Sequence, residues 1–99
     1  MKLAEPKSAQ DNDHLVDLAK SKAPLTGNSF WIGIDDKSQE GTFTYASDGY
    51  NVFYTNWKVA PDNHNGIEHC VHIHQYGPTN WKWNDYPCHK ILSFICEAF

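Results

Sequence analysis

Residues 70–85, which read CVHIHQYGPTNWKWND, carry the clearest indication of the fold. The first five of these residues, 70–74, alternate between apolar and polar side chains, which is the period of a strand with one buried face. Tryptophans recur at a spacing of two in residues 81–83 and predict a second short strand whose two indole rings share one face. This part of the chain is therefore expected to be β-structure.

Three further segments are short, apolar and rich in β-branched or aromatic residues. They are residues 30–34 (FWIGI), 42–45 (TFTY) and 91–96 (ILSFIC), and each predicts a short strand. Residues 50–67 form a long, Asn-rich segment with little periodicity. A loop of that length in a small domain is usually functional, so we expect a binding site in it.

One helix is predicted, over about residues 8–21. Ser8 stands at the N-cap position with Asp11 three residues later, which resembles a capping box. Apolar residues then recur at helical spacing, and Pro24 is expected to end the helix. One helix, several short strands and one long loop together predict an α+β fold.

Composition limits the class of protein. The chain has 99 residues, of which 40% are hydrophobic and 14% aromatic, so it has the size and content of one folded domain. It contains no apolar run approaching the roughly 18 residues of a membrane-spanning helix. Its 8 lysines, with no arginine, stand against 12 acidic residues, for a net charge of −4. We therefore expect neither nucleic acid nor membrane insertion.

Oxygen-bearing side chains gather in three places along the sequence. The first is the run of residues 35–40 after a predicted strand, the second is the segment 62–68 within the long loop, and the third is residues 84–85. Calcium takes six to eight oxygen ligands from carboxylates, amide carbonyls and the backbone. These three segments have the donor chemistry for Ca²⁺, although acidic loops are more often simply solvated.

Two other chemistries can be considered from the residues. His72 and His74 share one strand face and could hold zinc or copper with a third ligand, but such a pair more often faces solvent. Cys88 and His89 are adjacent, but nucleophilic catalysis needs a free sulfur with a base beside it in space. We expect no enzymatic activity.

Three cysteines cannot all pair within one chain, so one has a free thiol, an intermolecular bridge or a partner outside this sequence.

Several motifs occur in one order along almost the whole chain. They are Leu3-Ala4-x-Pro6, Trp31-Ile32-Gly33-Ile34 followed by Glu40-Gly41, Asn56-Trp57, Glu68-x-Cys70-Val71, Trp83-Asn84-Asp85 and Phe94-Ile95-Cys96-Glu97. This set resembles the C-type lectin-like domain family. The resemblance implies the C-type lectin-like fold over residues 1–99, with residues 3–6 at the start of the family's second helix. It places Trp31, Trp57 and Trp83 in the core and leaves Trp81 either packed or at the rim of the binding surface.

The resemblance also implies the cysteine pairing. Cys70 is expected to pair with Cys88, and the family pairs the terminal cysteine, here Cys96, with one in a first helix. On that basis the sequence is expected to lack the family's first strands and first helix.

The principal calcium and sugar site of the family maps onto named positions. The resemblance assigns Asp62, Glu68, Asn84 and Asp85 as ligands of both Ca²⁺ and a sugar. His64 is expected to pack against the sugar ring. The triplet that precedes this segment in the family begins with Glu or Gln, whereas this chain has Ala60. That change removes one metal ligand and one acceptor for a sugar hydroxyl.

An auxiliary calcium site is implied as well. It would use Asp36, Glu40, Asn63 and Glu68, together with the position before Cys70. That position is often Asp in the family and is His69 here. Because imidazole is a poor ligand for a hard cation, this site is expected to be weakened.

The function that the resemblance implies is calcium-dependent carbohydrate binding by a secreted, non-enzymatic domain. Its partners would be glycans or glycoproteins, and Asp62 favours galactose-type sugars. An upstream segment could make the protein an oligomer. The alternative is a calcium-independent domain of the same fold that recognises a protein, a mineral surface or ice, and Ala60 favours that alternative.

Overall fold

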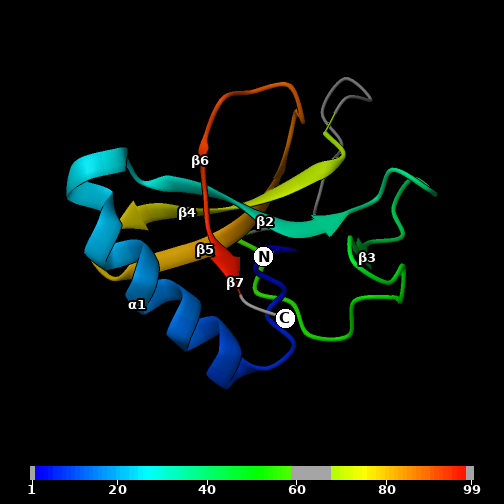
Figure 1. Ribbon diagram of the computed structural model, residues 1–99, viewed down its shortest axis with the longest axis horizontal. Coiled ribbons are helices and arrows are strands. Elements are labelled where there is room, and N and C mark those ends of the chain that lie inside the picture. Colours follow the sequence, from blue (N-terminus) through cyan, green and yellow to red (C-terminus); the bar gives the residue numbers. More distant parts are fainter. Residues whose placement is uncertain (1, 59–67, 98–99) are drawn as a thin grey trace.

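A computed structural model describes residues 2–58 and 68–97 of the chain (Figure 1). The elements in chain order are β1 (Lys2–Leu3), α1 (Ala9–Thr26), β2 (Ser29–Asp35), β3 (Thr44–Tyr45), β4 (Cys70–Gly77), β5 (Asn80–Tyr86), β6 (Ser93–Phe94) and β7 (Cys96–Glu97). The main sheet has the order β3-β2-β4-β5, and β6 adds to β2 in parallel. A separate antiparallel pair, β1 with β7, brings the two ends of the described chain together.

Strands β4 and β5 form an antiparallel pair, which a two-residue turn at 78–79 connects. Ile73 lies opposite Trp83 in this pair, and both are fully buried. Trp81 is 3% exposed, so it packs in the core and does not stand at a rim. The predicted strand over residues 70–74, with Val71 and Ile73 buried, and the shared face of the two tryptophans are both confirmed.

Helix α1 begins where the sequence predicts and ends later. The Ser8 hydroxyl accepts a hydrogen bond from the Asp11 N–H at 3.1 Å, which confirms the N-cap. The prediction that Pro24 ends the helix is wrong, because the helix continues to Thr26. Proline removes only one N–H in this last part of the helix. The helix stops at Gly27, which has a positive φ of 95° and donates its N–H to the Ala23 carbonyl.

The hydrophobic core lies between α1 and one face of the main sheet. Its buried side chains come from the helix and from every second position of the central strands, and include Leu15, Ala19, Phe30, Ile32, Ile34, Val71, Ile73, Trp81 and Trp83. The Trp83 indole N–H donates to the Asn12 side-chain oxygen at 2.9 Å, inside this layer. That bond satisfies two buried polar groups at once and joins the helix to the sheet.

Several boundaries differ from the sequence prediction. The strand expected over residues 42–45 is reduced to Thr44–Tyr45, and the run 91–96 gives two short strands, β6 and β7. Residues 3–6 precede the helix, and Leu3 belongs to β1, so these residues do not begin α1. No helix in the described part of the chain is long and apolar enough to cross a membrane.

Candidate functional site

The predicted ligand residues come from three segments that meet at one end of the sheet. Asp35 at the end of β2 lies opposite Cys70 at the start of β4, and Cys70 lies opposite Tyr86 at the end of β5. The ends of these strands are therefore held side by side by the sheet ladder. The turn after β2, the residues just before β4 and the end of β5 all lie at this end of the sheet.

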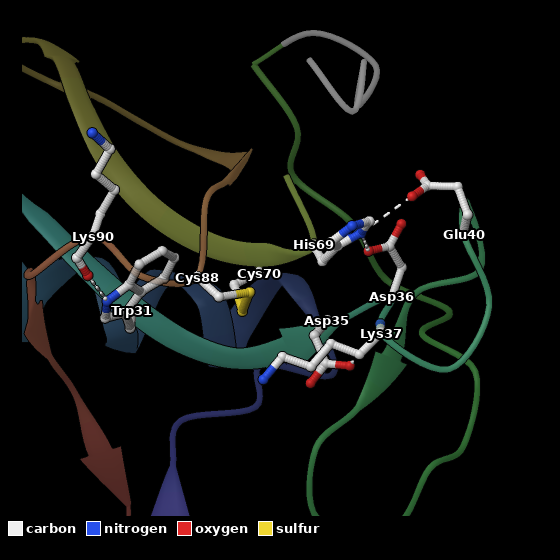
Figure 2. The surroundings of a disulfide bond; sticks show 9 residues. All are labelled: Trp31, Asp35, Asp36, Lys37, Glu40, His69, Cys70, Cys88 and Lys90. Atoms are coloured by element: carbon white, nitrogen blue, oxygen red, sulfur yellow. Dashed lines mark hydrogen bonds and ion pairs between the residues drawn. A yellow bond between two sulfur atoms is a disulfide. The ribbon is translucent and has the colours of Figure 1, made fainter. Parts of the chain in front are cut away.

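The Cys70–Cys88 disulfide, which the resemblance implied, lies at the same end of the sheet. Figure 2 shows it beside the turn after β2 and below His69. Because 18 positions separate the two cysteines, the bond is expected to stabilise the native fold by about 3 kcal/mol in the chain-entropy model. Cys96 is not in a disulfide within the described residues.

Three side chains converge tightly at this edge: Asp36, Glu40 and His69. The His69 Nδ1 lies 3.1 Å from Asp36 Oδ1 and also 3.1 Å from Glu40 Oε1. Figure 2 shows the imidazole pointing towards both carboxylates, which come from the turn after β2. Among the acidic, imidazole and thiol groups of the described ranges, only this set brings three potential metal-ligand atoms within 4.8 Å of one another.

The local backbone explains why this cluster forms. Asp36 is 1% exposed, and its N–H donates to the His69 carbonyl at 3.0 Å. Its Oδ2 accepts the N–H of Gly41 at 2.9 Å, which leaves Oδ1 facing His69. Desolvation and the neighbouring Asp36 carboxylate raise the pKa of Glu40 above its ordinary value.

Three residues of the predicted principal site also lie at this end of the sheet. Glu68 is half-buried and immediately precedes His69. Asn84 and Asp85 lie on β5, opposite His72 and Val71 of β4. Asp85 is 1% exposed and Asn84 is half-buried. These three residues therefore lie at the same end of the sheet, on or next to the paired strands β4 and β5.

Three predicted residues cannot be placed. Asp62, Asn63 and His64 lie outside the described residues, as does Ala60. Their roles stay predictions.

The donor chemistry of the two groups differs. Glu68, Asn84 and Asp85 supply oxygen donors only, which suits Ca²⁺. The second group presents an imidazole nitrogen between two carboxylates, and calcium does not favour nitrogen donors. By donor type alone, Glu68, Asn84 and Asp85 match Ca²⁺ better than the Asp36–Glu40–His69 group does.

The face of the sheet opposite the core has an aromatic cluster that the sequence did not predict. His72 is only 4% exposed and stacks on Tyr86, with ring centroids 4.6 Å apart. Trp31 lies 6.0 Å from the same imidazole. Residue spacing cannot show whether such a face is covered.

Burial has a direct consequence for His72. Neither of its ring nitrogens has a hydrogen-bond partner among the described residues, and burial, together with nearby His74, lowers its pKa to about 4. His74 is half-buried and bonds the Ser29 hydroxyl. The solvent-face interpretation is therefore wrong for His72. No third ligand of the acidic, imidazole or thiol type joins this pair in the described ranges.

Comparison with known proteins identifies the family. The sequence profile described as the lectin C-type domain matches residues 2–98. Salivary C-type lectin 1 of Aedes albopictus is 44% identical over 71 residues, which cover 68% of this chain and 46% of that protein. The alpha-N-acetylgalactosamine-specific lectin of Patiria pectinifera is 33% identical over 96 residues, covering 96% of this chain and 56% of that protein.

A solved structure agrees with these sequence matches. The C-type lectin CEL-I from Cucumaria echinata superposes with a TM-score of 0.79 at 27% identity, over 93% of this chain and 64% of that one. The chain thus spans about half to two thirds of the length of these relatives. With a family profile over nearly all of its residues and the matching α+β fold, the chain belongs to the C-type lectin domain family.

Proposed function

We propose that this chain is a secreted carbohydrate-binding domain whose sugar site depends on Ca²⁺. The observation that supports this most directly is that Glu68, Asn84 and Asp85 lie at the same end of the sheet as the Cys70–Cys88 disulfide. The chain that carries them is a member of a lectin family. Secretion is supported by the Cys70–Cys88 disulfide and by the salivary name of one relative. The proposed ligands are glycans or glycoproteins.

The proposed chemistry uses each side chain for a definite purpose. Glu68, Asn84 and Asp85 would hold Ca²⁺ through their oxygens, with Asp62 as a fourth ligand. The bound ion would supply coordination positions for two neighbouring sugar hydroxyls. The carboxylates accept hydrogen bonds from those hydroxyls, and the Asn84 amide donates one. His64 would pack against the apolar face of the sugar ring.

A galactose-type sugar is the proposed specificity. Asp62 supports it, and so does the printed specificity of the Patiria lectin for N-acetylgalactosamine. Ala60 provides no side-chain oxygen, so we expect lower affinity than a complete triplet would give.

Retention on immobilised galactose or N-acetylgalactosamine tests the proposal. The disulfide-intact chain should be retained in millimolar Ca²⁺ and eluted by a chelator. Asp85→Asn keeps the shape of the side chain but removes its charge. It should weaken sugar binding at least about tenfold, since charge-assisted contacts contribute about 1.5–3 kcal/mol.

Asp17→Asn is the matched control for that variant. Asp17 is an exposed carboxylate on α1, so retention should not change. Full retention of Asp85→Asn, with its circular dichroism unchanged, would contradict the assignment of this site.

The second candidate function is calcium-independent recognition of a protein, a mineral surface or ice. Two aromatic side chains favour it, because Tyr50 is 74% exposed and Phe53 is 76% exposed. Large exposed aromatics are typical of binding surfaces. Binding of a partner that persists in chelator, and that is lost in Tyr50→Ser with Phe53→Ser, would support this function instead.

A further inference from the structure

His69 gives the Asp36–Glu40–His69 cluster a donor set that the calcium proposal does not use. Its Nδ1 is equally distant, at 3.1 Å, from one oxygen of each carboxylate. A ring nitrogen carries at most one hydrogen, so one N–H serves two acceptors here. When both carboxylates are ionised, the cluster has a net charge of −2 with a neutral imidazole and −1 with a protonated one. A divalent cation would bond to all three atoms and offset that charge.

The chemistry of the three donors selects among cations. Calcium prefers oxygen donors at about 2.3–2.6 Å, whereas imidazole and carboxylate together suit zinc and its neighbours. Zn²⁺ binds His nitrogen and carboxylate oxygen at about 2.0–2.2 Å. Neighbouring ligand atoms of a tetrahedral site then lie about 3.3–3.5 Å apart. The two observed distances of 3.1 Å are only a few tenths of an ångström shorter.

The cluster is also oriented before any ion binds. Asp36 is buried, and the Gly41 N–H holds its Oδ2 at 2.9 Å, so its Oδ1 stays directed at His69. Hydrogen bonds of this kind orient ligands and strengthen metal sites. Glu40 is half exposed, which leaves a path for an ion and a position for water.

We propose that the Asp36–Glu40–His69 cluster binds a divalent transition-metal cation in place of the auxiliary Ca²⁺ of the family. Zn²⁺ is the cation that its donors match best. Asp36 Oδ1, Glu40 Oε1 and His69 Nδ1 are the protein ligands, and water fills the fourth position. Asn84 and Asp85 are not among its ligands, so the proposal does not rest on the proposed lectin activity.

Isothermal titration of the tag-free, disulfide-intact protein with ZnCl₂, without sugar, is the direct test. We expect one Zn²⁺ site. Glu40→Gln, which keeps the shape of a half-exposed side chain, should weaken it at least about tenfold. His14→Ala removes an exposed histidine on α1 and should leave Zn²⁺ binding unchanged. Co²⁺ in place of Zn²⁺ should give the visible absorption of a tetrahedral site in the wild type and not in Glu40→Gln.

His69→Asp is the reciprocal variant. It should lose the Zn²⁺ site and gain one more Ca²⁺ than the wild type, because it restores an all-oxygen donor set. The proposal is overturned if no Zn²⁺ binds, if Zn²⁺ binds equally well to Glu40→Gln, or if the wild type already takes Ca²⁺ at this cluster. Asp85→Asn should keep the Zn²⁺ site, so failure of the sugar proposal would be seen separately.

Discussion

At the scale of a residue, His72 shows how burial changes a titration. Its pKa is lowered to about 4 by burial and by nearby His74, while in the unfolded chain it is about 6.5. Between these two values the unfolded state binds a proton at His72 and the folded state does not. The contribution of His72 to the free energy of unfolding is therefore fully present above pH 6.5 and is lost as the pH falls towards 4. We expect about 2 kcal/mol less stability at pH 5 than at pH 7.5 from this residue.

Urea unfolding of the wild type and of His72→Phe at the two pH values measures this effect. Phenylalanine can keep the stacking on Tyr86 without a titrating group, so the variant should lose much less stability on acidification. His14→Ala should retain the wild-type dependence, because His14 is exposed on α1. An equal loss in wild type and His72→Phe would assign the acid sensitivity to other groups.

At the scale of an element, α1 depends on its N-cap. The Ser8 hydroxyl accepts the Asp11 N–H, which otherwise has no partner within the helix. Ser8→Ala should lower the free energy of unfolding by about 1 kcal/mol, and Ser8→Asp should restore most of it. Chemical denaturation monitored by helix circular dichroism measures both, and a Ser8→Ala variant as stable as wild type would show that water caps this end equally well.

At the scale of the whole molecule, calcium should stabilise the fold. A ligand that binds only the native state contributes about 2.7 kcal/mol at 100 times its dissociation constant, which raises the Tm of a 99-residue domain by several degrees. Thermal unfolding in chelator and in millimolar Ca²⁺ measures the shift. Asp85→Asn should show a smaller shift, and a wild-type Tm that is the same in both conditions would count against the calcium site.

Most of the local structure could be predicted from short-range patterns in the amino-acid sequence. The strand over residues 70–74, the shared face of Trp81 and Trp83, and the Ser8 cap depend on side chains a few positions apart, and the structure has all three. The resemblance of its motifs added the family and the Cys70–Cys88 pair. Pro24 shows the limit of such patterns, because the helix continues past it to Gly27.

Contacts between residues far apart in the sequence, and the burial that they cause, became visible only in the folded molecule. A period of two places His72 on the face opposite Val71 without saying that Trp31 and Tyr86 bury it. The motif resemblance grouped Asp36 and Glu40 with the position of His69. It did not predict that His69 Nδ1 lies at the same distance from both carboxylates. Pairing of distant strands and the side-chain geometry at their ends set these contacts, because they depend on register and packing across the sheet and not on neighbours along the chain.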